Sequence, residues 1–317
     1  MSRWHYTRGL HDLGNGCFAW LQPDGSLGWS NAGLVAGDGA SLLVDTLWDV
    51  PLTRSMLDGM GGVTADAPIE ILVNTHANGD HWWGNELLAG TEIVASRRCR
   101  DEMTHDIKPS DLAALMTLSG LGAGADYFRE RVKAFDFTTV TPTLPTRVFD
   151  GRLDLEVGGT EALLLEVGPA HTLGDTLVHV PVAKTIFTGD ILFIDGTPIM
   201  WQGPVENWIR ACDLMLGMDL EVVVPGHGPI TDLRGVRAVR NYLAYIHVEA
   251  RKRFDVGLSA LDAAKDIALD DFSSWGDAER IAVNVDTLYR EFSKSDSPPN
   301  VLELLGRMAE VERSRRT

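Results

Sequence analysis

The sequence of 317 residues is poor in cysteine and in positive charge. Its three cysteines, Cys17, Cys99 and Cys212, are odd in number and widely spaced, which favours reduced thiols in the core over a disulfide framework. The 28 Lys and Arg residues are outnumbered by 45 Asp and Glu residues, so the net charge is −17. Such a surface repels phosphate backbones and anionic lipid headgroups, so neither nucleic acid nor a membrane is expected as a partner.

Long hydrophobic runs are also missing, because no apolar stretch approaches the roughly 20 residues that span a bilayer. The segment 1–10 has cationic residues but no apolar run behind them, which is unlike a secretory signal, so we expect a cytoplasmic protein. The composition, 44% hydrophobic and 23% charged, is that of an ordinary globular chain. We expect residues 1–317 to form a single domain with a substantial core.

Short β-branched runs alternate with helical periodicity through most of the chain, which favours an α/β fold. The first half predicts a hairpin, helices and strands, in chain order 33–36, 41–45, 51–60, 69–73, 83–88 and 92–95. Residues 97–147 form a helical insert, with Gly120, Gly122 and Gly124 as candidate hinges. Strands resume at 152–157, 162–167, 176–180, 185–187 and 222–224. A C-terminal extension over 231–317 contains helices at 233–253, 258–267, 278–292 and 301–312. This order of strands and helices indicates two sheets packed face to face, with helices on their outer sides.

Polar residues follow five of the predicted strands. They are Asp45, the segment 76–81, His171, Asp190 and His227. Strand ends at one edge of a sandwich converge, and imidazoles with carboxylates are the ligands of zinc or iron-like ions. Taken singly, each His is as readily a hydrogen-bonded structural residue, and Asp190 a turn cap. The ordered set favours a metal site. The other histidines lack this setting and are taken as structural or surface residues: His5, His11, His105, His179 and His247.

Four motifs resemble the metal-binding motifs of the metallo-β-lactamase fold superfamily. They are Thr75-His-Ala-Asn-Gly-Asp-His81, Gly168-Pro-Ala-His171-Thr-Leu-Gly-Asp175, Phe187-Thr-Gly-Asp190 and Pro225-Gly-His227-Gly. The resemblance covers about residues 31 to 230 and implies an αββα sandwich with a one- or two-metal site at its edge.

The resemblance also implies a role for individual residues. The first metal would be bound by His76, position 78, His171 and a bridging Asp190, and the second by Asp80, His81, Asp190 and His227. Position 78 departs from the family pattern, because Asn78 replaces a histidine and is at best a weak oxygen donor, so the first site is expected to be weaker. Asp45 resembles the buried aspartate that holds the metal-binding loop through hydrogen bonds.

These residues predict a hydrolase that uses one or two Zn²⁺ ions. Zinc lowers the pKa of bound water to about 7, so a metal-bound hydroxide could attack an ester, thioester or lactone, with Asp80 as the catalytic residue that moves a proton. The bridging carboxylate of Asp190, where many true β-lactamases have a thiol, argues against antibiotic hydrolysis. Trp83 and Trp201 are the best candidates for an apolar substrate pocket, with Trp48 and Trp82 near the same motifs.

Shorter stretches also resemble a branch whose members act as cyclase and thioesterase on aromatic polyketide chains held on a carrier protein. The substrate is accordingly expected to be a small-molecule or carrier-bound acyl compound, and the oligomeric state stays open. Two alternatives remain: an iron-dependent oxidoreductase or dioxygenase on the same fold, and a non-catalytic binding protein with a decayed metal site. Six of the seven ligand positions are retained, which disfavours the second alternative.

Overall fold

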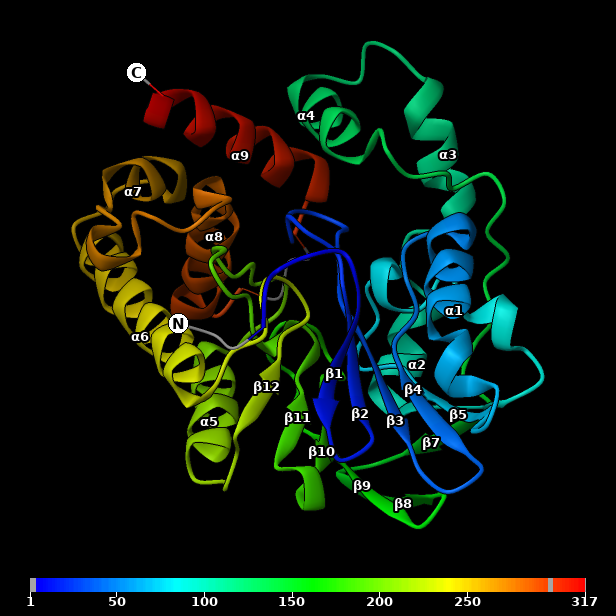
Figure 1. Ribbon diagram of the computed structural model, residues 1–317. Coiled ribbons are helices and arrows are strands. Elements are labelled where there is room, and N and C mark those ends of the chain that lie inside the picture. The colour runs from blue at the N-terminus through cyan, green and yellow to red at the C-terminus, as the bar shows by residue number, and fades with distance from the viewer. Residues whose placement is uncertain (1–3, 296–298, 317) are drawn as a thin grey trace.

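Two β-sheets lie face to face between layers of helices (Figure 1) in a computed structural model that describes residues 4–295 and 299–316. Residues 1–3 of the N-terminal segment 1–10, which does not resemble a secretory signal, lie outside the described residues. The first sheet has the order β1(Gly9–Gly14), β2(Cys17–Leu21), β3(Ala32–Ala36), β4(Ser41–Val44), β5(Ile69–Val73), β6(Glu92–Ser96) and β7(Arg147–Phe149). The second has the order β12(Val222–Val224), β11(Thr185–Phe187), β10(Thr176–Val180), β9(Thr160–Glu166) and β8(Arg152–Val157).

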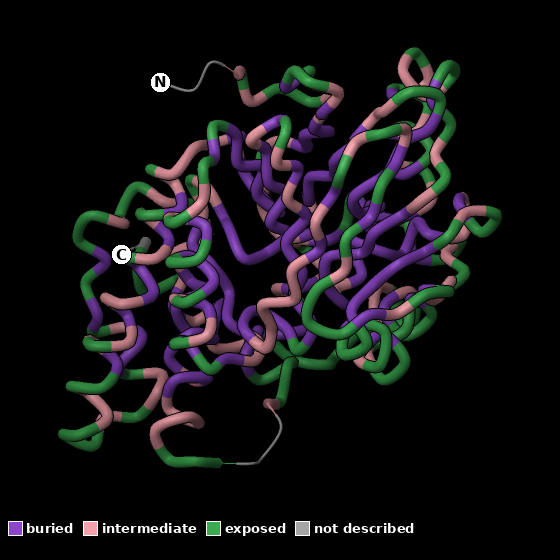
Figure 2. The backbone as a smooth tube through the Cα atoms, turned by 90° about the horizontal axis from the view of Figure 1, so that it is seen from below, coloured by how far each residue is buried: buried purple, intermediate pink, exposed green. Residues whose placement is uncertain are grey.

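The alternation of side chains along each strand divides the core into layers. In β4, Leu42 and Val44 belong to the apolar layer between the sheets, whereas Leu43 belongs to the layer beneath the outer helix. In β12, Val222 and Val224 join the same central layer, and Val223 faces the helices on the other side. Both faces of both sheets are therefore covered, and Figure 2 shows buried backbone through the middle of the molecule and exposed residues at its periphery.

Helices cover the outer faces of the two sheets. On the first sheet lies α1(Val50–Thr64), whose Met56 and Met60 pack with Leu43 of β4, and α2(Arg97–Met103) contacts β6 and β7. The second sheet is covered by α5(Val205–Leu216) and α6(Leu233–Asp255), which pack on each other. The remaining C-terminal helices are α7(Ala260–Asp266), α8(Ile281–Ser293) and α9(Val301–Arg316). The αββα sandwich predicted from the sequence is confirmed.

The predicted insert contains α2, α3(Pro109–Thr117) and α4(Ala123–Val132). Figure 1 shows α4 beside α9, so the insert and the C-terminal end of the chain meet on one side of the sheets. The hinge prediction is wrong for Gly124, because this residue lies inside α4, where an added Cβ would overlap the carbonyl oxygen of Leu302. Gly120 and Gly122 precede that helix with positive φ angles of 78° and 89°.

Several elements differ from the sequence prediction. The helix expected over 83–88 is only a 3₁₀ helix at Asn85–Leu88, because Trp83 and Gly84 form the turn that ends the metal loop. Strands β1 and β2 were not predicted, since β1 carries only Leu10 and Leu13 as large apolar residues. Helix α5 was also missed, although its buried side chains at 205, 208, 212 and 215 have helical spacing.

The predicted state of the cysteines is confirmed, since Cys17, Cys99 and Cys212 are buried and unpaired with one another. Among the residues described, no helix has the length and apolar character that crossing a membrane requires.

Candidate metal centre

The predicted ligands meet at one edge of the sandwich, where the strands that carry them end. Asp45 follows β4, the segment 76–81 follows β5, Asp190 follows β11 and His227 follows β12. His171 comes from the loop between β9 and β10. The ligand atoms form two groups, His76 with His171 and Asp190, and Asp80 with His81 and His227, and within each group all atoms lie within 4.8 Å of one another.

Asp190 lies between the two groups. Its Oδ2 is 3.4 Å from Nε2 of His171 and 3.7 Å from Nε2 of His76. The same carboxylate approaches the second group, with Oδ2 at 3.5 Å from Nε2 of His227 and Oδ1 at 3.1 Å from Nε2 of His81. Asp190 is therefore in the position that a bridging carboxylate would occupy.

Several inward-facing atoms of this cluster are buried and have no hydrogen-bond partner. They are Nε2 of His76, Nε2 of His81 and Oδ1 of Asp190. An unpaired buried polar atom is costly, and here three of them share one small space. Four imidazoles and two carboxylates form a donor set suited to zinc or a similar transition metal. The residues present therefore fit a pair of divalent metal ions.

The outward-facing nitrogen of each candidate histidine ligand has its own partner, which fixes the ring. Nδ1 of His81 lies 2.9 Å from Oδ2 of Asp45, and Nδ1 of His171 lies 2.7 Å from the carbonyl oxygen of Ile199. The other two Nδ1 atoms face Thr75 Oγ1 at 3.0 Å, for His76, and the Gly25 carbonyl oxygen at 3.1 Å, for His227. Each ring thus presents Nε2 to the centre of the cluster, as metal ligands do.

Asp45 organises the loop as well as the ring of His81. Its carboxylate accepts hydrogen bonds from the backbone N–H and the hydroxyl of Thr75, both at 2.7 Å. Asp45 is buried and has a φ of 64°, a conformation that is uncommon outside glycine. Such strain persists only where surrounding contacts hold it, and here the contacts converge on the metal loop.

The pKa shifts divide the candidate histidine ligands, because His81 and His227 have raised values whereas His76 has a lowered one. Burial opposes the protonation of His81, but Asp190, Asp80 and Asp45 outweigh this and raise its pKa well above the usual value. Burial likewise opposes protonation of His227, yet chiefly Asp190 raises its pKa to about 9. By contrast, burial lowers the pKa of His76 well below its usual value. Nearby positive charge therefore stabilises the carboxylates of the cluster, and divalent metal ions would supply that charge.

Asn78 takes part in the first group despite its departure from the family pattern. Its Oδ1 lies 2.7 Å from Nε2 of His171. Because Nδ1 of His171 already donates to Ile199, and burial lowers the pKa of this ring, Nε2 carries a lone pair. A half-turn of the carboxamide brings the Asn78 N–H₂ to this lone pair as a donor, so Asn78 and His171 form a hydrogen-bonded pair within the first group.

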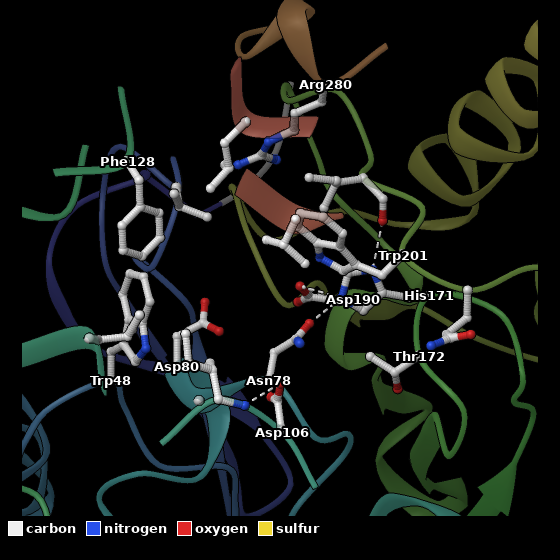
Figure 3. Close-up of a pocket in the computed structure, with 18 of the residues that line it drawn as sticks. Trp48, Asn78, Asp80, Asp106, Phe128, His171, Thr172, Asp190, Trp201 and Arg280 are labelled. Atoms are coloured by element: carbon white, nitrogen blue, oxygen red, sulfur yellow. Dashed lines mark hydrogen bonds and ion pairs between the residues drawn. The ribbon is translucent and has the colours of Figure 1, made fainter. Parts of the chain in front are cut away.

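Four residues of the two groups line a cavity of about 340 Å³ (Figure 3), namely Asp80, His171, Asp190 and His227. Its walls are mainly apolar and include side chains from the insert and from the C-terminal helices. The insert contributes Glu102, Asp106, Ile107, Leu112, Leu115 and Phe128. The other side is formed by Phe193, Ile199, Trp201, Arg280, Val301, Leu302 and Leu305. The insert therefore covers the metal cleft, as its position in the chain predicted.

The tryptophans predicted for the pocket differ in their placement. Trp201 and Trp48 line the cavity (Figure 3). Trp83 contributes to the lining but is only 1% exposed, so it acts mainly as core beneath Gly79. Trp82 does not line the cavity and instead donates a hydrogen bond to the carbonyl oxygen of Ala77 at 2.7 Å.

Sequence reasoning missed Phe128, Phe193 and Arg280 as parts of the site. Phe128 belongs to the insert, where nothing in the sequence distinguishes a cavity residue from a core residue. Arg280 lies far beyond the last metal motif and reaches the cavity only because the C-terminal helices return to it. Phe193 follows Asp190 by three residues, so its proximity to that ligand was the one available signal.

The fold and the site define this protein as a two-sheet αββα sandwich with candidate metal-binding His and Asp clusters at one edge. A family model described as the metallo-beta-lactamase superfamily matches residues 27–227. The chain therefore belongs to the metallo-beta-lactamase superfamily, a superfamily of metal-dependent hydrolases, and it carries candidate metal-binding His and Asp clusters.

Individual relatives are distant. The alpha subunit of 2,4-dinitroanisole O-demethylase from Nocardioides sp. (strain JS1661) is 22% identical over 200 residues, which are 61% of this chain and 51% of that protein. The stereoselective inverting sec-alkylsulfatase from Pseudomonas sp. has a TM-score of 0.66 at 17% identity, over 92% of this chain and 52% of that one. A metallo-beta-lactamase from Pontibacter korlensis has a TM-score of 0.56 at 19% identity, over 75% and 99%. The chain thus spans about half the length of the first two proteins, and the structural likenesses show the fold alone.

Proposed function

We propose that this protein is a zinc-dependent hydrolase of a compact ester, thioester or lactone with an aromatic or otherwise apolar acyl group. The observation that carries the proposal is the position of the two ligand groups, four residues of which line an apolar cavity together with Trp48, Phe128 and Trp201. A cavity of this kind binds a small apolar ligand and presents its reactive bond to the polar groups at the bottom.

The ligand residues divide between two metal positions that share Asp190. One position would be held by His76, His171 and Asp190 with the Asn78 oxygen nearby, and the other by Asp80, His81, His227 and Asp190. A bound divalent metal ion would lower the pKa of the water molecule that it binds and would polarise the carbonyl oxygen of the substrate.

Asp80 is the residue proposed to move a proton during catalysis. Its Oδ2 lies 3.3 Å from Nε2 of His227, and Asp80 also lines the cavity. His227 and His81, which outweigh burial, lower the pKa of Asp80, so the residue is ionised and able to accept a proton at neutral pH. It can therefore act as a base toward a group that enters the cavity above the cluster.

The walls of the cavity position the acyl group and exclude water. Trp48 lies against Phe128, with ring centroids 6.4 Å apart in an edge-on arrangement. Trp201 lies across the cavity, beside His171 (Figure 3). Flat walls of this kind suit aromatic acyl chains, which supports the polyketide thioester, free or carrier-bound, as the specific substrate within this proposal.

The test is a panel of substrates supplied to the zinc-loaded protein. It contains 4-nitrophenyl esters, aryl thioesters and aryl lactones, together with 2,4-dinitroanisole and a sec-alkyl sulfate, the two substrate types suggested by the relatives' names. We expect hydrolysis of the acyl compounds. Turnover of only the ether or the sulfate would contradict acyl hydrolysis, and iron content with thiol-dependent oxygen uptake would favour the oxidoreductase alternative.

A matched pair of variants tests whether the cluster carries the activity. His81→Ala removes a buried ligand, so we expect loss of bound metal and a fall in kcat/KM of at least about a hundredfold. His247→Ala removes a partly exposed histidine on α6 and should leave both unchanged. Full metal content and wild-type activity in His81→Ala would show that the assignment is wrong.

A further inference from the structure

We propose that Arg280 binds a carboxylate at the end of the substrate opposite the scissile bond, so that the protein prefers aryl or alkyl acyl compounds that carry an acid group. The inference rests on the proposed function, because the ligand is a substrate only if the protein is a hydrolase. The binding of a carboxylate by Arg280 does not depend on turnover. Arg280 lies outside residues 27–227, which match the family model, so it is a feature of the C-terminal helices of this chain.

Arg280 is a buried cation in the wall of the metal cavity. It ends the 3₁₀ helix Ala278–Arg280, is 2% exposed, and lines the cavity above the metal groups (Figure 3). Its guanidinium carbon lies 5.2 Å from the ring centroid of Phe193. Phe193 in turn stacks on His227, with centroids 5.2 Å apart and planes at 7°. The ring of Phe193 thus lies between the guanidinium and His227, a candidate metal ligand. A small acyl chain can span this separation.

The guanidinium retains donors after its protein contacts are counted. Nη1 donates to the carbonyl oxygen of Thr197 at 3.0 Å, and Nη2 lies 2.9 Å from Oδ2 of Asp277. A guanidinium has five N–H donors, so these contacts leave donors for a ligand. Asp277 does not line the metal cavity but a smaller neighbouring one, which Arg280 also borders.

The charges around the cavity give an anion one favourable direction. Among the described residues, Arg280 is the only Lys or Arg in the lining, whereas Glu102 and Asp106 belong to the insert. Figure 3 places Asp106 and Arg280 on opposite sides. An acid group is therefore attracted to Arg280, and in an apolar wall this attraction is weakly screened.

The test compares the binding of 4-phenylbutyrate and 4-phenylbutyramide, which differ in their terminal acid or amide group, to zinc-loaded protein by isothermal titration calorimetry. We expect the carboxylate to bind roughly ten- to a hundredfold more tightly in the wild type. Arg280→Met should abolish the preference and Arg280→Lys should retain part of it. Arg234→Met, which removes an exposed arginine and changes the net charge equally, should leave it intact.

A second variant keeps the inference testable if Arg280→Met does not fold. Asp277→Asn preserves the residue size and tolerates the left-handed backbone at φ 55°, while it removes the counter-ion of Arg280. We expect it to increase the carboxylate preference. An unchanged preference in Asp277→Asn, equal binding of the two ligands by the wild type, or a preference that survives in Arg280→Met would each overturn the assignment, the last because the metals would then hold the acid group.

The binding result separates this inference from the proposed function. If no acyl compound is hydrolysed but the carboxylate preference depends on Arg280, the hydrolase proposal fails and the anion site stands. If esters are hydrolysed, mono-4-nitrophenyl glutarate should have a lower KM than 4-nitrophenyl butyrate in the wild type and lose that advantage in Arg280→Met. Hydrolysis with equal KM values in both proteins would overturn the anion site and leave the hydrolase proposal intact.

Discussion

At the scale of single residues, the site depends on the atoms that face away from its centre. Asp45 joins His81 to the backbone of Thr75, and Thr75 in turn contacts His76, so one carboxylate controls two rings. Because the outward nitrogens are occupied, Nε2 is the only ring atom of each candidate ligand that can bind a metal. The hydrogen bonds of the outward nitrogens therefore fix which atom of each ring faces the centre of the cluster.

Asn78→His is expected to raise the metal content. Imidazole is a stronger donor to zinc than a carboxamide oxygen, and residue 78 contacts His171 in the first ligand group only. The wild type should bind between one and two zinc ions per chain, depending on supply, and the variant should approach two. Titration with zinc followed by calorimetry and elemental analysis measures both.

The control for this prediction is Asn15→His, which adds a histidine on an exposed turn between β1 and β2 and should leave the metal content unchanged. Catalysis need not improve in Asn78→His, because an imidazole presents its donor with a different geometry from an amide. Two equally tight zinc sites in the wild type would show that the substitution of Asn for His at this position does not weaken the first site.

At the scale of secondary structure, the cavity is closed by helices that are far apart in the chain. Helix α4 of the insert packs on α9 near the C-terminal end, and Phe128 and Leu305 from these two helices both line the cavity. Gly124 allows the close approach, because its Cα faces the backbone of α9 at Leu302. The roof of the cavity therefore depends on one helix contact.

Gly124→Ala is expected to loosen this roof. The added methyl group overlaps the Leu302 carbonyl oxygen, so the two helices must separate, at a cost of about 1–3 kcal/mol in the free energy of unfolding. Substrate preference should change, since the cavity wall moves, whereas zinc content should not. Urea unfolding, elemental analysis and the substrate panel measure the three quantities.

Gly62→Ala is the matched control, because Gly62 lies in α1 with nothing near its added Cβ. It should stabilise the protein by up to about 1 kcal/mol through helix propensity and leave substrate preference unchanged. A Gly124→Ala protein with wild-type stability and specificity would show that the α4–α9 contact does not shape the cavity.

At the scale of the whole molecule, the C-terminal helices hold the loop that positions a candidate metal ligand. Asn284 of α8 accepts a hydrogen bond from the N–H of Met200 at 2.8 Å and donates to the Pro198 carbonyl oxygen at 2.9 Å. Between them lies Ile199, whose carbonyl oxygen faces Nδ1 of His171. Helices beyond the family-matched residues thus orient a ligand that the family motifs supply.

The attachment of these helices predicts how stability depends on pH. Glu291 of α8 accepts a hydrogen bond from the N–H of Val205, and burial raises its pKa to about 7 from 4.5. A folded-state pKa above the unfolded value means that its contribution is complete below about pH 4.5 and is lost as the pH rises through about 7. Glu291→Gln keeps the acceptor and removes the titration.

We therefore expect the free energy of unfolding of the wild type to fall relative to Glu291→Gln between about pH 5 and pH 8. Solvent screening of this partly buried group reduces the difference to about 1–2 kcal/mol. Urea unfolding of both proteins across this range, at fixed zinc concentration, measures it. Glu70→Gln, on the exposed side of β5, should parallel the wild type, and a Glu291→Gln profile that also parallels it would contradict the raised pKa.

The sequence by itself determined the sandwich and the set of candidate ligands, because both depend on local patterns. Runs rich in β-branched residues, such as 69–73 and 222–224, indicate buried strands, and the strand ends bring His76, Asp190 and His227 to one edge. The motifs also identified Asp45 and the unusual Asn78. These features need only nearby residues and the general rules of sheet packing.

Only the tertiary structure decided what surrounds the metal groups. The wall residues Phe128 and Arg280, the backbone contact at Gly124 and the support of Ile199 by Asn284 join segments that are far apart in the chain. Neither the periodicity nor the spacing of residues in the sequence indicates which helix packs against which wall of the cavity. The packing of α4 on α9 and of α8 against the loop around Ile199 fixes these contacts, and they determine which substrates the cavity can admit.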